Sequence, residues 1–283
     1  MKKYIVYLLL SLVFLLGIFL YQGLSVRDKN LHLVVCNVGQ GDAIYIKTPS
    51  GKDVLVDGGP NDKVSDCLNK HMPFWDRDIE LMVLTHPDAD HITGLVNVLE
   101  RYNVLHFVTS KTSKNTGIYR KFTEALKAEG LSPKYVFQND NIDFGDGVIS
   151  NILWPVSEAL IKYNRASEVN ELSVIQVINF GDFKALLTGD AGETVHETLI
   201  GFLNGIDVIK VPHHGSKTGM SEIFISKLNP SLAVISVGKN NRYGHPTKYI
   251  LDLLTKYKIK TLRTDKNGEV EIVSDGKSYW VVN

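Results

Sequence analysis

Short apolar runs bounded by Gly, Pro, Asn and Asp recur along the chain from Leu31 to its end. The first runs have the length and β-branched content of strands and are separated by turn residues, which predicts an antiparallel meander. Further along, similar runs alternate with segments that have the apolar period of an amphipathic helix. A β-rich chain with interspersed helices predicts an α+β fold of two layered sheets with helices outside.

The strands expected from these runs are 31–38, 43–48, 54–56, 79–84, 104–109, 136–137, 142–144, 148–154, 174–180, 183–187, 206–211, 232–237, 259–263, 269–273 and 279–282. The helices expected between them are 64–71, 92–101, 118–129, 191–200, 221–228 and 247–257. No internal repeat, low-complexity tract or Pro/Ser-rich linker interrupts this pattern. We therefore expect one domain over residues 31–283.

Residues 1–25 differ from everything that follows. Lys2 and Lys3 lead into an apolar run from Tyr4 to Tyr21, which is the pattern of a signal peptide or an N-terminal membrane anchor. No small-x-small cleavage site follows the run, so we expect an uncleaved anchor. The two lysines would stay in the cytoplasm, which predicts an extracytoplasmic domain, secreted or anchored to the outer face of the cytoplasmic membrane.

The chain has two cysteines, Cys36 and Cys67. Two cysteines allow one disulfide, but neither a disulfide framework nor a cysteine-based metal site. Cys36 lies inside a strand pattern, so we expect it in the core rather than at a lipidation site.

Charge is balanced overall but uneven along the chain. The formal net charge is +0, so no whole-molecule field indicates a nucleic-acid or membrane partner. Lys and Arg nevertheless outnumber the acids within residues 101–134 and 235–263. Such stretches are usually solvated helix faces, but on the rim of an active site they would attract a polyanion.

The densest group of reactive side chains is the segment Thr85-His86-Pro87-Asp88-Ala89-Asp90-His91, between a predicted strand and a predicted helix. Its nitrogen and oxygen donors suit zinc, manganese or iron. We expect His86 to pair with Asp88, and Asp90 with His91, each pair facing a different ion. The alternative is a helix N-terminus that the aspartates cap and stabilise, but this leaves both histidines unexplained.

Three further aspartates stand where predicted strands end. Asp42 and Asp57 are placed toward the loop that carries His86, where they would orient ligand imidazoles. Tight turns alone explain the glycines beside them. Asp190 follows the strand 183–187 and either bridges two ions or caps the next helix.

The remaining histidines fall into two groups. His213 and His214 follow the strand 206–211, and His245 lies in a loop after another strand, so these three belong with the metal motif. His71 and His106 stand alone on mixed faces, and we expect them to be packed or solvent-facing rather than ligands.

The motifs together resemble the metallo-β-lactamase superfamily and, within it, the subgroup similar to the extracytoplasmic domain of the DNA-uptake protein ComEC. The segments that carry the resemblance are Asn37-Val38-Gly39-Gln40-Gly41-Asp42, Asp57-Gly58-Gly59, Thr85 to His91, Leu187-Thr188-Gly189-Asp190, Val211-Pro212-His213-His214-Gly215-Ser216 and Tyr243-Gly244-His245-Pro246. The resemblance implies an αββα four-layer sandwich with a metal site at one edge of the two sheets, and hydrolysis by a metal-bound water.

The resemblance also implies roles by position. His86 and Asp88 would hold a first ion, Asp90 and His91 a second, and Asp190 would bridge them. Asp88 stands where the usual His-x-His-x-Asp-His motif has its second histidine, as in the ComEC-like subgroup.

The last ligand of the superfamily aligns with His214. The histidine that many members supply just before the bridging aspartate has no counterpart here, and Asn170 or Ser173 lies nearest in sequence. His213 and His245 are then candidates for contacting phosphate or protonating the leaving group. His245 is alternatively a ligand, in the manner of the longer ribonuclease-like members.

We therefore predict a metal-dependent hydrolase, namely a phosphodiesterase or nuclease that acts on extracellular DNA or another external nucleic acid with one or two Zn²⁺ or Mn²⁺ ions. Its expected catalytic residues are Asp90, His213 and His245. The expected substrate-binding residues are Ser216, Lys217, Lys239 and Arg242.

Two alternatives stay open. One is hydrolysis of a small external ester, such as a phosphocholine ester, a lactone or a β-lactam. The other is a non-catalytic, tethered metal-binding domain, although structural zinc sites are closed and usually rich in cysteine. With one membrane segment at most, the chain is not expected to translocate DNA by itself.

Overall fold

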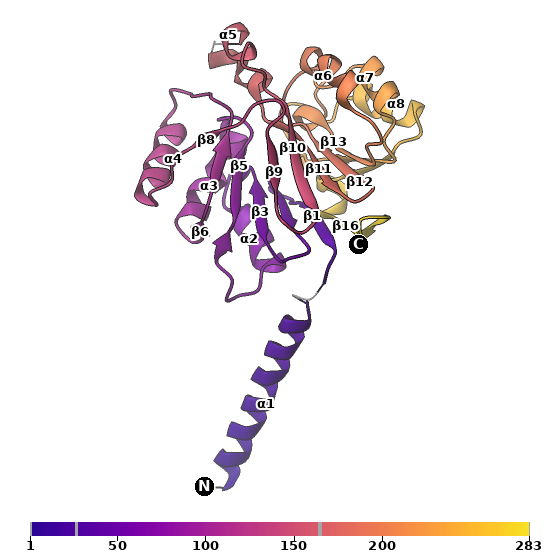
Figure 1. Ribbon diagram of the computed structural model, residues 1–283. Helices are drawn as coiled ribbons and strands as arrows, with labels where there is room; N and C mark the ends of the chain where they lie inside the picture. The colour runs from indigo at the N-terminus through magenta and orange to yellow at the C-terminus, as the bar shows by residue number, and fades with distance from the viewer. Residues whose placement is uncertain (1, 26–27, 164–165, 283) are drawn as a thin grey trace.

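The computed structural model describes residues 2–25, 28–163 and 166–282. The N-terminal helix α1 (Lys2–Ser25) extends away from the rest of the chain (Figure 1). Its low amphipathicity follows from an apolar surface on all sides, and its large apolar side chains from Tyr4 to Leu16 are exposed. Among the described residues, no helix combines the length and the apolarity needed to cross a membrane.

The first sheet has eight strands in the order β17-β16-β1-β2-β3-β5-β7-β8. Strands β1, β2 and β3 pair antiparallel, as the predicted meander requires, whereas β3, β5, β7 and β8 are parallel neighbours. The bounds are β1 (Leu31–Val35), β2 (Ile44–Lys47), β3 (Asp53–Val56), β5 (Leu81–Leu84), β7 (Phe107–Thr109), β8 (Lys134–Tyr135), β16 (Val270–Ser274) and β17 (Tyr279–Val282).

The second sheet has seven strands in the order β15-β14-β13-β12-β11-β10-β9. Strands β9 to β12 form an antiparallel meander, and β12 to β15 are parallel. The bounds are β9 (Asn141–Asp143), β10 (Val148–Trp154), β11 (Ile175–Phe180), β12 (Phe183–Leu187), β13 (Val208–Lys210), β14 (Leu232–Ile235) and β15 (Lys260–Arg263).

Two of the predicted strands are wrong as single elements. The run 79–84 divides into β4 (Asp78–Ile79) and β5, and the run 104–109 divides into β6 (Asn103–Val104) and β7. Strands β4 and β6 pair with each other in a separate two-stranded sheet. The chain turns at Glu80, whose backbone N–H donates to the Asp53 carbonyl oxygen at 2.9 Å. Apolar content alone did not reveal this change of partner.

The helices cover the outer faces of the two sheets (Figure 1). The helices of the first half are α2 (Lys63–His71), α3 (Ala89–Leu99) and α4 (Gly117–Ala128). Those of the second half are α5 (Ala159–Lys162), η1 (Ala166–Leu172), α6 (Glu193–Leu199), η2 (Ile200–Phe202), η3 (Pro212–Gly215), α7 (Glu222–Leu228), α8 (Lys248–Lys256) and α9 (Thr264–Asn267).

Three apolar layers result from this arrangement. The middle layer takes residues such as Val35 and Leu187 from the facing sides of both sheets. One outer layer joins the first sheet to α2, α3 and α4, and the other joins the second sheet to α6, α7 and α8. This is the predicted αββα sandwich. The side chains alternate between the middle layer and an outer layer because successive strand residues point to opposite faces.

The topology brings the candidate motifs to one edge of the sandwich. Strand β1 runs parallel to β3 and β5, since β2 is antiparallel to both β1 and β3. The loops after β1, β3 and β5 therefore leave the same edge of the first sheet. The loops after the parallel strands β12, β13 and β14 likewise leave one edge of the second sheet. These are the loops that carry the histidine and aspartate motifs.

Candidate metal centre

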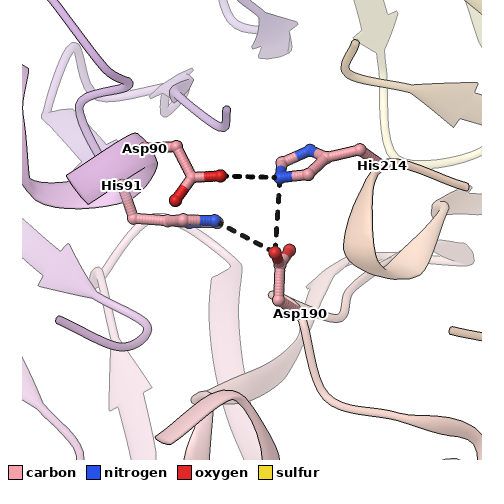
Figure 2. Close-up of side chains that lie close together, drawn as sticks. All are labelled: Asp90, His91, Asp190 and His214. Atoms are coloured by element: carbon pink, nitrogen blue, oxygen red, sulfur yellow. Dashed lines mark ion pairs between the residues drawn. The ribbon is translucent and has the colours of Figure 1, made fainter. Parts of the chain in front are cut away.

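Four of the predicted ligands converge where the two sheets meet. Asp90 and His91 lie in the first turn of α3, Asp190 follows β12, and His214 lies in η3. Each offers one ligand atom, and these atoms all lie within 4.8 Å of one another. The Nε2 atoms of His91 and His214 both lie 3.3 Å from Oδ2 of Asp190, and His214 Nε2 lies 3.4 Å from Oδ2 of Asp90 (Figure 2).

The backbone at the second half of the site is held in an unusual conformation. His213 has φ 48° and His214 has φ 53°, in the left-handed region that residues other than glycine rarely adopt. Such a conformation costs about 1–3 kcal/mol and persists where the surrounding structure fixes it. In this conformation, the imidazoles of both His213 and His214, which follow β13, lie toward Asp190.

His86 lies beside this cluster. Its ring centroid is 4.1 Å from that of His91, and its Nδ1 lies 3.1 Å from Thr85 Oγ1 and 3.3 Å from Ser173 Oγ. Both hydroxyl protons are used elsewhere, since Thr85 donates to Asp57 and Ser173 donates to the Asn170 carbonyl oxygen. His86 Nδ1 must then carry the proton, which leaves Nε2 as a lone-pair donor.

The same tautomer is fixed in the other two histidines. His91 Nδ1 donates to Oδ2 of Asp57 at 2.7 Å, and His214 Nδ1 donates to the carbonyl oxygen of Ser236 at 3.0 Å. Among the described residues, the buried Nε2 atoms of His86, His91 and His214 have no hydrogen-bond partner. The Nε2 atoms of His91 and His214 face the Asp190 carboxylate. Once their Nε2 protons are displaced, these buried imidazoles and the carboxylate form a donor set that fits a divalent ion.

Asp57 occupies the orienting position that we predicted, whereas Asp42 lies beside a ligand imidazole without a hydrogen bond to it among the described residues. Asp57 accepts from the Thr85 backbone N–H at 2.8 Å and from the Thr85 hydroxyl at 2.7 Å, in addition to His91. Asp42 Oδ1 lies 3.4 Å from His214 Nδ1. Both carboxylates are buried. Asp57 fixes the His91 imidazole, whereas the Nδ1 proton of His214 goes to the Ser236 carbonyl oxygen rather than to Asp42.

Asp88 is placed differently from the other predicted ligands. It is the N-cap residue of α3 but its side chain makes no capping hydrogen bond. Its carboxylate pairs instead with Lys114, which comes from the loop after β7. Asp88 lines the same cleft as Asp90. The alternative role of Asp190 as a helix cap is wrong, because Gly192 is the N-cap residue of α6.

A buried lysine lies beneath the cluster. Lys210, at the end of β13, is 1% exposed and forms an ion pair with Asp42. Its Nζ also donates to the carbonyl oxygen of Gly189 at 3.1 Å and lies 3.5 Å from Oδ1 of Asp190. Burial alone would lower the pKa of Lys210, but Asp42 and Asp190 raise it, so the ammonium group is charged.

The carboxylates and imidazoles shift one another's protonation. Burial would raise the pKa of Asp190, but His214, His91 and Lys210 hold it well below its ordinary value. Burial would likewise lower the pKa of His91, but Asp190 and Asp57 hold it well above its ordinary value. Burial lowers the pKa of His86 to about 3, and the neighbouring His91 acts in the same direction. Ion binding must displace the protons that these attractions favour, so affinity for the ion depends on pH.

The cluster opens into a small polar cleft with a volume of about 170 Å³. The residues that line it are Gln40, Asp88, Asp90, Asn170, Asp190, His213, His214, Tyr243 and His245. The cleft therefore contains all three predicted catalytic residues and four of the predicted ligands. The sequence pattern did not identify Gln40 or Tyr243, although both lie inside the quoted motifs.

The predicted substrate-binding residues do not line this cleft. Ser216 is half-buried beside Thr218, with their hydroxyl oxygens 3.3 Å apart. Lys217, Lys239 and Arg242 are exposed on the flanking loops. Their role toward a substrate stays a prediction.

The two cysteines form a disulfide between Cys36 and Cys67. Both are buried in the layer between the first sheet and its helices, so the prediction of a core position for Cys36 is confirmed. Cys67 also lies near His71 and Glu269, but its sulfur is committed to the disulfide. His71 Nε2 is 2.9 Å from Glu269 Oε1, so His71 is packed against a partner, and His106 is exposed to solvent.

Sequence comparisons place this geometry among known proteins. Residues 36–166 match the family model described as the metallo-beta-lactamase superfamily. The chain is 30% identical over 280 residues to ComE operon protein 3 of Bacillus subtilis, covering 92% of this chain and 34% of that protein. It is 27% identical over 268 residues to Competence protein ComA of Neisseria gonorrhoeae, covering 92% of this chain and 35% of that protein. The chain thus spans about a third of the length of these curated relatives.

A shorter match joins the chain to Exodeoxyribonuclease YycJ of Bacillus anthracis, at 31% identity over 83 residues, or 29% of this chain and 31% of that protein. Among solved structures, the metallo-beta-lactamase fold protein YhfI of Bacillus subtilis has a TM-score of 0.56 at 11% identity, covering 89% of this chain and 100% of that chain. Zn²⁺-bound PqqB of Methylobacterium extorquens has a TM-score of 0.51 at 14% identity, covering 82% of this chain and 97% of that chain. At these identities the likeness to solved structures shows the fold alone. The chain therefore has a metallo-β-lactamase fold, its residues 36–166 match the metallo-beta-lactamase superfamily, and it is similar over most of its length to competence proteins.

Proposed function

We propose that this metallo-hydrolase is a phosphodiesterase that cleaves nucleic acid outside the cytoplasm. The observation that carries the proposal is the cleft itself. Its base is a nitrogen and oxygen donor set suited to zinc or manganese, and two further imidazoles, His213 and His245, stand on its wall. The names of the similar proteins, which include competence proteins and an exodeoxyribonuclease, support nucleic acid as the substrate.

Asp90, His91, Asp190 and His214 would hold one divalent ion, and His86 with Asp88 would contribute to a second. Divalent ions activate water at neutral pH and neutralise the charge that develops on phosphorus oxygens. One carboxylate oxygen of Asp88 is engaged by Lys114, which leaves the other oxygen as its ligand atom. We propose Zn²⁺ or Mn²⁺ as the ion, since both accept mixed imidazole and carboxylate ligands.

Two histidines of the cleft, His213 and His245, are placed to act on a bound phosphodiester. His213 Nε2 lies 3.9 Å from Oδ2 of Asp190, which places its ring between the ligand cluster and the open side of the cleft. Burial and the neighbouring His213 and His214 lower the pKa of His245. A bound phosphate would oppose this effect, because its negative charge favours the protonated imidazole. His245 would then hold a proton for the leaving oxygen while the substrate is present.

The disulfide supports a location outside the cytoplasm, and the apolar helix α1 supports attachment to a membrane. The Cys36–Cys67 disulfide belongs to an oxidising compartment. The apolar helix α1 extends from the domain and exposes side chains such as Phe14 and Leu15. We propose that α1 attaches the domain to the membrane and that the cleft faces the external nucleic acid.

A substrate screen tests this function. The wild-type protein, freed of metal and then loaded with Zn²⁺ or Mn²⁺, is given plasmid DNA, single-stranded DNA, bis-p-nitrophenyl phosphate, a lactone and a chromogenic β-lactam. We expect turnover of the phosphodiesters that chelation abolishes. Turnover confined to the lactone or the β-lactam would contradict the phosphodiesterase proposal, and metal binding without any turnover would favour a non-catalytic domain.

A further inference from the structure

Tyr243 is an exposed aromatic side chain at the mouth of the cleft. It is 53% exposed, it lies on the loop between β14 and α8, and it lines the cleft together with His245. Its ring is nearly parallel to the His245 imidazole, with an interplanar angle of 17° and a centroid separation of 5.8 Å. The proposed hydrolysis assigns no role to this ring.

The loop holds Tyr243 in a defined position. The side-chain oxygen of Asn241 accepts from the backbone N–H groups of Tyr243 at 3.1 Å and His245 at 3.0 Å. The Asn241 amide nitrogen donates to the carbonyl oxygens of Gly238 at 3.0 Å and His245 at 2.7 Å. One side chain thus closes the loop on itself, so the backbone that carries Tyr243 is held in place without a substrate.

Arg242 adds a cation to the ring. Its guanidinium carbon lies 5.0 Å from the Tyr243 ring centroid, and one of its terminal nitrogens donates to the Tyr243 hydroxyl at 2.9 Å. The hydrogen bond holds the guanidinium toward the hydroxyl end of the ring, and about half of the tyrosine stays accessible to solvent. An exposed aromatic face beside an arginine is the combination with which proteins stack single-stranded bases.

The size of the cleft explains why stacking would occur at its mouth. Its volume of about 170 Å³ is below the roughly 300–1,000 Å³ of pockets that enclose a small organic ligand. The cleft accepts a phosphate group but not a whole nucleotide. A base attached to that phosphate must lie on the rim, and Tyr243 is the aromatic side chain, other than the histidines, that lines this part of the described structure.

We propose that Tyr243 is a stacking platform for the nucleobase next to the phosphate in the cleft, and that Arg242 contacts a flanking phosphate. The inference rests on the proposed function and narrows its substrate to strands with unpaired bases. Bases inside a duplex are already stacked on their neighbours and are not available to a protein ring, whereas single strands offer them freely. Because every base has an aromatic face, the platform would select unpaired bases without selecting a sequence.

The test compares two strands that differ only in their bases. One is an oligothymidylate, and the other is an oligomer of the same length and charge with abasic tetrahydrofuran sugars. We expect Tyr243→Leu to lower kcat/KM on oligothymidylate by roughly 5- to 100-fold, mainly through KM, and to change kcat/KM on the abasic strand less than twofold. Tyr243→Phe should recover most of the loss because it keeps the ring. Tyr249→Leu, at a partly exposed tyrosine on α8, is the matched control and should behave as wild type on both strands.

The outcomes separate this inference from the function on which it rests. An equal loss on both strands in Tyr243→Leu, or no loss on oligothymidylate, would overturn the stacking role while cleavage by the wild type upholds the phosphodiesterase. Failure of Tyr243→Phe to recover activity would also overturn the stacking role, since it would assign the effect to the hydroxyl group. If the metal-loaded wild type cleaves plasmid DNA but neither single strand, the restriction to unpaired bases is overturned. If it cleaves no phosphodiester at all, the proposed function itself is overturned.

Discussion

Replacement of Lys210 by methionine tests how far its ammonium group stabilises the buried carboxylates of Asp42 and Asp190. Methionine has a similar length and no charge, so Lys210→Met removes the ammonium group with little change in packing volume. Three contacts disappear, namely those to Asp42, to the Gly189 carbonyl oxygen and to Asp190. The Asp42 carboxylate then stays buried without its principal partner.

The expected cost follows from burial. Removing one partner of a buried ion pair costs about 3–5 kcal/mol, because the other charge stays buried and uncompensated. Lys210 and Asp42 are both 1% exposed, so water screens neither. A loss of this size would lower Tm by roughly 10 °C in a domain of this length. His91 and His214 lie at Oδ2 of Asp190, whereas Lys210 lies at Oδ1. An ion held by these histidines would therefore not replace the charge beside Asp42 and would restore only part of the stability.

Guanidinium unfolding of metal-free protein measures the effect. Lys184→Met is the matched control, since Lys184 lies on the adjacent strand β12 and its ammonium donates to the Asn204 carbonyl oxygen at an exposed position. We expect the control to change the free energy of unfolding by about 0.5 kcal/mol or less. A loss below about 1 kcal/mol in Lys210→Met would refute the reasoning, because it would mean that the buried carboxylates do not depend on the lysine.

Two further predictions concern single side chains around the centre and in the outer layer. Asp57→Asn should weaken ion binding by about 10- to 100-fold, because His91 loses the carboxylate that fixes its tautomer. Calorimetric titration measures the affinity for the ion. An affinity equal to that of the exposed control Asp66→Asn would contradict the prediction. Burial lowers the pKa of His196 to about 4, so as pH falls this histidine is protonated in the unfolded chain before it is protonated in the folded protein. The folded protein therefore loses stability as pH falls from about 6.5 toward 4, and the loss from this residue is at most about 3 kcal/mol. Urea unfolding from about pH 7.5 to about pH 4.5 should show a smaller decline in His196→Gln, and an identical decline in both proteins would rule out His196 as its source.

The sequence predicted the layers and most of the ligand cluster because these depend on local patterns. Strands such as β10 and β12 have the predicted bounds, since apolar alternation and a two-residue turn define them. Asp90 and His91 follow the loop after β5 in the first sheet, and Asp190 follows β12 in the second sheet. Loops after parallel strands leave one edge of their own sheet, but only the family resemblance implied that the edges of the two sheets meet.

Other parts of the site depend on contacts between distant segments. Lys114 follows β7, and nothing near it in sequence indicates that it pairs with Asp88. The position of Lys210 inside an apolar strand indicates that it has a buried partner. The pattern does not identify that partner, because Asp42 lies far away in the chain. Lys217 and Lys239 were predicted from charge alone, and charge does not determine which loop faces the cleft.

Cleavage of a single-stranded oligonucleotide by wild-type protein and by Asp190→Asn, over a titration with Mn²⁺, tests the central claim most directly. Asp190 contacts both His91 and His214, so we expect wild-type cleavage to rise with Mn²⁺ to saturation and Asp190→Asn to lose at least about 100-fold in rate. The exposed Asp182→Asn on the same hairpin should cleave as wild type does. Cleavage by Asp190→Asn at the wild-type rate, or wild-type cleavage that persists in excess chelator, would contradict the account.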